Sequence, residues 1–192
     1  AAFNFDNFWD GRARFHFNGG SVFGPSDPAA HVFIDPGSPG GTAALNLQAT
    51  TNGHVRPELL AEDPEVAEQP IRIKFSSLAS QAAGPPLSPF EMSCAGRIFA
   101  QVGKKLLSPS VVPLGRQLVD PSDSVLGPIA RPGAGVTVSY RSLVEQAFQP
   151  QWWSSSQSVT VQGQAFSQEE ANFSLFFGLA VQLYEATLVA DQ

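Results

Sequence analysis

Charged residues and cysteine are scarce in this chain. Charged side chains account for 15% of its 192 residues, whereas an average soluble protein has roughly 25%. Cys94 is the single cysteine, so no disulfide can form within the chain, which excludes a small cross-linked secreted domain. No apolar run approaches the roughly 20 residues that a membrane-spanning helix needs, and we therefore expect no membrane contact.

Basic clusters are equally scarce. The net charge is −6, and Lys104-Lys105 is the only basic doublet. A nucleic-acid-binding protein needs a basic stripe to displace counterions from phosphates, so the sequence argues against a dedicated nucleic-acid binder. A surface poor in charge is instead typical of a protein whose exterior is partly covered by neighbouring subunits.

The residues that usually carry chemistry do not fall into a recognisable pattern. His16, His31 and His54 show no spacing typical of a metal site, although the first two lie in neighbouring predicted strands. The surroundings of Cys94 match no nucleophile motif, and we expect this cysteine to be buried. We therefore predict that the chain is not an enzyme and has no catalytic residue, no cofactor and no metal.

Alternation of apolar and polar residues is clearest over residues 8–18. Trp9, Phe15 and Phe17 share one parity with two small residues, and polar side chains occupy the other. Because successive side chains of a strand point to opposite faces, this pattern predicts a half-buried strand. His16 is then expected on the outer face.

Further apolar segments, separated by many of the 16 Pro and 17 Gly, indicate an all-β sandwich of about eight strands. Chains of this size bury roughly 70% of their unfolded surface in one core, so we expect one domain over residues 1–192. A short helix is predicted at 140–148, ended by Pro150. The other predicted strands are residues 29–35, 42–49, 70–76, 89–102, 134–140, 157–166 and 171–189. The expected core side chains are Trp9, Phe15, Phe17, Ile71, Ile73, Phe75, Phe173, Leu175 and Phe177.

Residues 103–133 combine five prolines with scattered aliphatic residues and predict a long irregular excursion. Trp152 and Trp153 are adjacent, so in a strand one indole must point away from the core. We interpret these two segments as contacts with other chains. The candidate interface residues are Trp152, Trp153, Leu114, Leu118 and Leu126.

Two motifs carry a resemblance to a known family. Residues 7–17 (NFWDGRARFHF) and residues 170–178 (EANFSLFFG) resemble strands of the jelly-roll coat proteins of picorna-like viruses. The size of 20.4 kDa and the terminal Gln192 are similar in particular to the small coat proteins of plant comovirus and cheravirus relatives. The ends of the chain, Ala1 and Gln192, also fit cleavage of a polyprotein after Gln and before a small residue; trimming of the chain or removal of a signal peptide are the alternatives.

The resemblance implies a single jelly-roll domain that assembles with other capsid protein subunits into an icosahedral shell. It further implies weak contact with packaged RNA, and a location in the virion and, during assembly, in the host cytoplasm. The alternative hypothesis is a carbohydrate-binding β-sandwich module or lectin, with Trp9, Tyr140 and either Trp152 or Trp153 as sugar-stacking residues.

Overall fold

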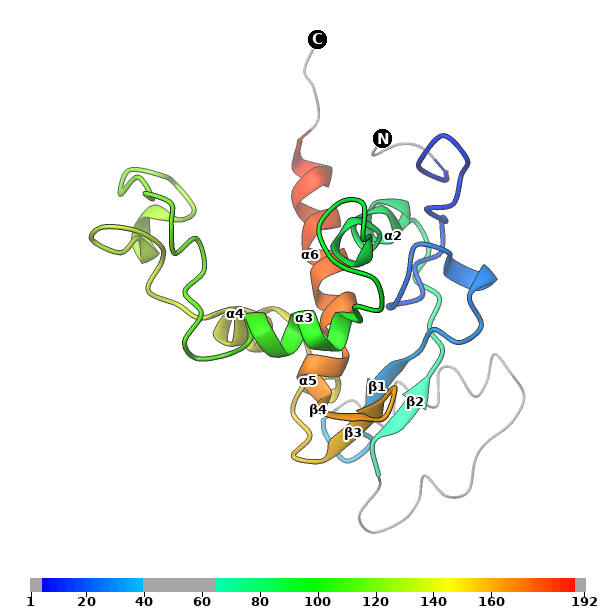
Figure 1. Cartoon of the computed structure of the whole chain (residues 1–192). Helices are drawn as coiled ribbons and strands as arrows, with labels where there is room; N and C mark the ends of the chain where they lie inside the picture. The colour runs from blue at the N-terminus through cyan, green and yellow to red at the C-terminus, as the bar shows by residue number, and fades with distance from the viewer. Residues whose placement is uncertain (1–4, 40–64, 189–192) are drawn as a thin grey trace.

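The structure is a computed structural model that describes residues 5–39 and 65–188, and all structural statements refer to these residues. Helices make up more of the described part than strands do, and irregular segments connect them (Figure 1). Its α-helices are α2 (Ser77–Ala82), α3 (Phe99–Leu106), α4 (Tyr140–Ala147), α5 (Gln168–Ala171) and α6 (Phe173–Thr187). Its strands are β1 (Val32–Ile34), β2 (Ala67–Gln69), β3 (Ser158–Val161) and β4 (Gln164–Ser167). Short 3-10 turns occur at Gly24–Ser26 (η1), Pro85–Leu87 (η3), Gly127–Ile129 (η4) and Pro150–Trp152 (η5).

The described strands form two separate two-stranded antiparallel sheets. In one, Phe33 of β1 faces Glu68 of β2. In the other, β3 and β4 form a hairpin whose turn residues, Gln162 and Gly163, both have positive φ, as a two-residue turn of matching twist requires. The prediction of an all-β jelly roll of about eight strands is therefore wrong, because neither two-stranded sheet offers a face for sandwich packing.

The largest correction concerns residues 171–189, predicted as strand and found as helix α6. Ser167 and Glu170 form a capping box, in which the Ser167 side chain accepts from the Glu170 main-chain N–H and the Glu170 carboxylate accepts from the Ser167 N–H. This cap starts α5, and α6 follows directly after Asn172. The first turns of α6 are buried on nearly all sides, so the apolar run lacks the one-sided period that marks a surface helix.

Residues 8–18 also depart from the predicted strand. Asn7 and Ala13 pair through main-chain hydrogen bonds and enclose a tight turn, in which Phe8 and Gly11 have positive φ. The Asp10 carboxylate accepts from the Arg12 main-chain N–H at 3.2 Å, a contact typical of turns. As a result Trp9, expected in the core, lies at the tip of the turn with its side chain 94% exposed.

Of the remaining predictions of secondary structure, some are confirmed and others are wrong. Helix α4 confirms the predicted helix at 140–148, and residues 29–35 and 157–166 do contain β structure. Residues 70–76 and 134–140 contribute only isolated bridges, at Ile73 and Val136, and residues 89–102 form turns that lead into α3. These three strand predictions are wrong, because each segment bends after a few residues. The strand predicted at 42–49 lies outside the described residues.

The core lies where α2 and α3 meet α5 and α6 (Figure 1). Gly178 brings α6 close to its neighbours, since a Cβ at this position would lie 2.8 Å from the Phe17 ring and 3.1 Å from the Ala79 carbonyl oxygen. Phe17, Ile71, Phe173 and Leu175 are buried as expected, and Phe15, Ile73 and Phe177 are partly buried. Trp9 and Phe75 are exposed, which corrects the core prediction for these two residues.

Candidate functional site

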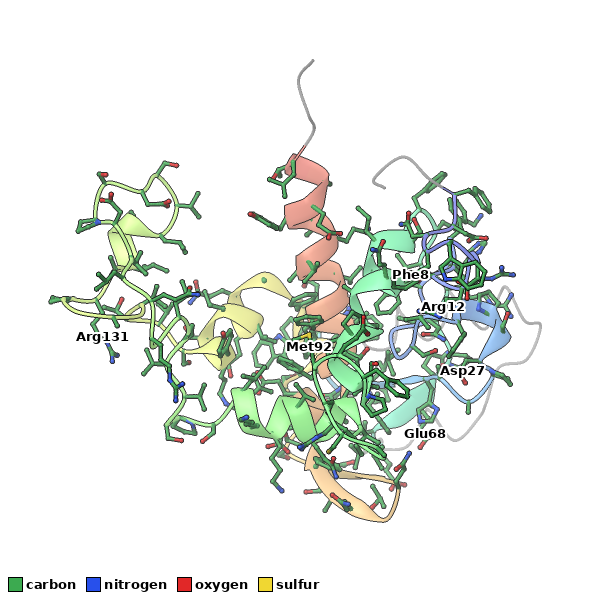
Figure 2. All side chains as sticks on the ribbon, turned by 45° about the horizontal axis from the view of Figure 1, so that its top comes forward. Phe8, Arg12, Asp27, Glu68, Met92 and Arg131 are labelled. Carbon is green, nitrogen blue, oxygen red and sulfur yellow. The ribbon has the colours of Figure 1, made fainter. Side chains whose placement is uncertain are left out.

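Residues 108–139, between α3 and α4, form a projection that stands away from α2, α3 and α6 (Figures 1 and 2). Figure 2 places Arg131 on this projection, on the opposite side of the molecule from Phe8 and Arg12. The segment is irregular apart from the turn η4, which agrees with the irregular excursion predicted for residues 103–133. The first residues of that predicted range, 103–106, belong to α3.

Main-chain hydrogen bonds give the projection its own shape. Val136 N–H donates to the Pro113 carbonyl at 3.2 Å, and Gly135 N–H donates to the Gln117 carbonyl at 2.9 Å. Thr137 N–H donates to the Ile129 carbonyl at 2.8 Å. Within the described chain, the hydrogen bonds that link residues 109–138 to residues outside this range all go to Ser108, at the start of the projection. The projection therefore meets the body mainly through its two ends.

Two aspartates shape the outer turns of the projection. The Asp120 carboxylate accepts from the main-chain N–H and the hydroxyl of Ser122, which lowers its pKa. The Asp123 carboxylate accepts from the Leu126 and Val125 N–H groups, which lowers its pKa in the same way. Both carboxylates therefore stabilise the loop by accepting hydrogen bonds from it, and these hydrogen bonds favour their ionised form.

The candidate interface leucines lie on this projection but differ in exposure. Leu118 is 85% exposed and Val125, close to Leu126, is 75% exposed. Leu114 and Leu126 are partly buried, and Leu114 has a positive φ of 55°. The structure therefore brings the three candidates onto one projection, and Leu118 is the one that faces solvent most fully.

Trp152 is the last residue of η5 and Trp153 follows it, so neither lies in a strand. Both indoles are partly buried and pack against the core. The Trp153 ring N–H donates to the Phe148 carbonyl at 2.9 Å, which ties this segment to the end of α4. Both side chains therefore support the fold, and neither is the outward-facing indole that adjacent strand positions would have required.

A buried carboxylate lies on α5, the helix whose Gln168 contacts the Gln151 carbonyl of η5. Glu169 on α5 has a side chain only 1% exposed, and its Oε2 pairs with Nη1 of Arg141 at the start of α4. Its other oxygen, Oε1, has no hydrogen-bond partner among the described residues. Burial raises the pKa of Glu169 to about 7; Arg141 opposes the increase, while Glu145 and Glu170 add to it.

The residues beside Glu169 bind main-chain groups. Asn172 is buried; its Oδ1 accepts from the Phe33 N–H at 2.8 Å, and its Nδ2 donates to the carbonyls of Phe33 and Trp152. Gln168 donates to the carbonyls of Phe33 and Gln151. Sequence reasoning missed this cluster, although the Ser167-x-x-Glu170 pattern before an apolar run was a signal for the helix that carries it.

Three aromatic rings form a second surface, built from the exposed Phe5 and Phe75 and the partly buried Phe15. The Phe5 and Phe15 rings stack with centroids 4.0 Å apart, and the Phe75 ring lies edge-on to Phe15 at 4.8 Å. Phe75 is 80% exposed and has a φ of 59°, an uncommon conformation for a bulky residue. We call these three residues the aromatic surface.

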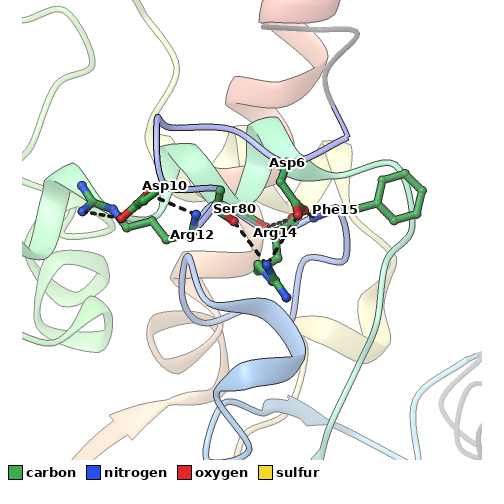
Figure 3. Close-up of polar contacts among 7 residues, drawn as sticks. Asp6, Asp10, Arg12, Arg14, Phe15 and Ser80 are labelled. Atoms are coloured by element: carbon green, nitrogen blue, oxygen red, sulfur yellow. Dashed lines mark hydrogen bonds and ion pairs between the residues drawn. The ribbon is translucent and has the colours of Figure 1, made fainter.

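Charged residues hold the chain behind the aromatic surface (Figure 3). Asp6 accepts from the Phe15 main-chain N–H at 2.6 Å and lies 3.5 Å from the Arg14 guanidinium. Ser80 on α2 donates its hydroxyl to the Arg14 carbonyl at 2.7 Å. The aromatic surface is therefore tied to the helical body by polar contacts rather than by burial of its own rings.

The remaining candidate residues are dispersed. His31 Nε2 lies 3.4 Å from a Glu68 carboxylate oxygen across the β1–β2 pair, and His16 is edge-on to the Phe15 ring. His54 lies outside the described residues. Cys94 is exposed in a turn, so the expectation that it is buried is wrong. Among residues 5–39 and 65–188, no group of three or more His, Cys, Asp or Glu side chains could hold a metal ion, and no helix has the length and apolar character to cross a membrane.

Comparisons of this chain with protein-family models, curated proteins and solved structures found no match.

Proposed function

We propose that this chain is a structural subunit that binds further copies of itself through the projection and the exposed apolar side chains of the body. The observation that carries this proposal is the number of large apolar side chains left in water. Trp9, Phe75, Phe90, Leu118 and Val125 are each at least 75% exposed. Burial of such side chains against a partner removes them from water, which is why exposed apolar surface is typical of interaction sites.

The composition of the projection suits docking against protein. It contains two arginines and two aspartates, so its formal charge is balanced. Its prolines and internal hydrogen bonds hold the loops in shape before binding, so little conformational entropy is lost on docking. A standard interface removes about 800 Å² from each partner, which requires more than one of the exposed regions to take part.

A coat-protein role is the more specific form of this proposal, and its support is the low charge and the sequence resemblance alone. Residues 7–17 and 170–178, which carry the resemblance, form a turn and two helices rather than the strands of a jelly roll. Assembly into an icosahedral shell therefore stays a prediction, to be tested by the same measurement of particle size.

Size in solution tests the proposal. We expect the wild-type chain to form oligomers whose mass, measured by light scattering after size exclusion, rises with concentration. The double variant Leu118→Ser, Val125→Ser should shift toward the 20.4 kDa monomer. Gln117→Ser, an exposed polar neighbour in the same loop, is the matched control and should assemble like the wild type. A wild-type chain that stays monomeric at every concentration would overturn the proposal.

Carbohydrate binding is the second candidate, favoured by the nearly complete exposure of the Trp9 indole. Its other stacking candidates, Tyr140, Trp152 and Trp153, pack against the core. A glycan panel decides between the two: binding by a monomeric wild-type chain that Trp9→Ala abolishes would favour the lectin hypothesis over self-assembly.

A further inference from the structure

The projection depends on α4 for its position. No hydrogen bond within the described chain joins residues 109–138 to the body, so its orientation follows from how α3 and α4 are seated. α3 is anchored firmly, because Phe99 and Ala100 are buried and a Cβ at Gly103 would lie 2.7 Å from Phe173 Cβ. α4 has a single buried residue, Val144, with Tyr140 and Phe148 packed partly against the core. The end of the projection that leads into α4 is therefore held less firmly than the end that follows α3.

The Arg141–Glu169 pair is the charged link between α4 and the body. Arg141 is the second residue of α4, directly after the projection ends, and its side chain is about half exposed. Glu169 is held in place by the buried helix α5. When the carboxylate loses its charge, Arg141 can return to water at little cost, whereas Glu169 stays buried. The pair is thus asymmetric, with one fixed partner and one that can leave.

The other ionisable groups around Glu169 do not replace Arg141. Glu145 on α4 and Glu170 on α5 carry the same charge as Glu169. Among the elements packed against α5, α3 carries Lys104 and Lys105, both exposed, and Lys104 Nζ lies over the Phe166 ring at 5.5 Å. The strands β1, β3 and β4 carry no ionisable side chain, and those of α6 are Tyr184 and Glu185 near its far end.

We propose that Glu169 and Arg141 form a proton-controlled latch at the base of the projection: the ionised pair holds α4 against α5, and protonation of the buried carboxylate releases Arg141 and loosens the projection. Three observations on residues 5–39 and 65–188 carry this inference: Glu169 is buried, its Oε1 has no partner there, and Arg141 is its one cationic partner there. The elevated pKa of Glu169, about 7, places the change near neutral pH. The latch is a property of the monomer and does not require that the projection bind a partner.

A distance measurement across the latch tests the proposal. Spin labels on the native Cys94, which is exposed on the body, and on Ser124→Cys in the projection report their separation in the full chain at a concentration where it is monomeric. We expect a narrow distance distribution well above neutral pH and a broader one well below it, with a midpoint at about pH 7. Circular dichroism over the same pH range checks that the secondary structure stays intact.

Variants assign the change to the pair. Glu169→Gln and Arg141→Met should each give the broad distribution at both pH values, so either one suffices if the other fails to fold. Glu145→Gln removes an exposed carboxylate from α4, the helix that carries Arg141. This variant should keep the pH response, with the midpoint at a lower pH because Glu145 raises the pKa of Glu169. A wild-type distribution that does not change with pH, or a pH response that persists in Glu169→Gln, would overturn the latch.

Discussion

Replacing Glu169 by Gln should make the stability of the protein less dependent on pH. The pKa of Glu169 rises from its ordinary value of 4.5 to about 7 in the folded chain, chiefly because burial disfavours the ionised form. A group whose pKa is higher in the folded state stabilises the fold when protonated. Its stabilising effect is therefore complete below about pH 4.5 and is lost as the pH rises through about 7.

The size of the effect follows from the difference between the two pKa values. That difference, about 2.5 units, corresponds to about 3 kcal/mol of unfolding free energy, an upper figure because water reaches the half-exposed Arg141. Glutamine keeps the shape of the side chain without the charge. Glu169→Gln should thus match the wild type below about pH 4.5, and above about pH 8 it should be more stable by up to about 3 kcal/mol.

Urea unfolding followed by tryptophan fluorescence, repeated across this pH range, measures the difference between the two proteins. Glu145→Gln serves as the control: this carboxylate is exposed, and its removal should keep the pH dependence of stability, with only a small shift of the midpoint to lower pH. A Glu169→Gln protein less stable than the wild type above pH 8 would refute the reasoning. It would mean that the attraction to Arg141 outweighs the cost of burying the carboxylate.

Four further substitutions test the packing and the buried hydrogen bonds. Phe17→Ala should lower the free energy of unfolding by about 3 to 5 kcal/mol, whereas Phe15→Ala should cost less because its ring is partly exposed; chemical denaturation of both variants checks the order. Gly178→Ala should destabilise by about 1 to 3 kcal/mol, despite the better helix propensity of alanine, because its Cβ meets the Phe17 ring; a raised melting temperature would contradict the close approach of α6 to Phe17. Asn172→Ala should cost about 1 to 3 kcal/mol for each main-chain group it leaves unpaired, with faster amide exchange at Phe33 as the specific sign.

Some features followed from local chemistry and were predictable. The helix at 140–148 was recognisable from its short amphipathic run before Pro150, and Ser139 caps it by accepting from the Ser142 N–H. The density of proline in residues 103–133 indicated an irregular excursion because proline removes main-chain donors and restricts its neighbours. Such signals act within a few residues, so they hold regardless of what packs nearby.

The candidate site was only partly predictable. Leu114, Leu118 and Leu126 do lie on one projection, but the sequence did not indicate that Trp152 and Trp153 would pack inward against the core. Nor did it single out Glu169. Whether a carboxylate is buried depends on the elements that cover it, and these come from segments far away in the chain.

What the sequence determined by itself was the absence of an internal disulfide, the low charge, the proline-rich excursion and the short helix at 140–148. The tertiary structure decided that residues 173–187 are a helix, because an apolar run that is buried on nearly all sides has no period to separate helix from strand. It also decided that Trp9 and Phe75 face solvent while Glu169 is buried. Exposure is a property of the packed whole, so a residue's own chemistry gives only its preference, and the covering elements decide the outcome.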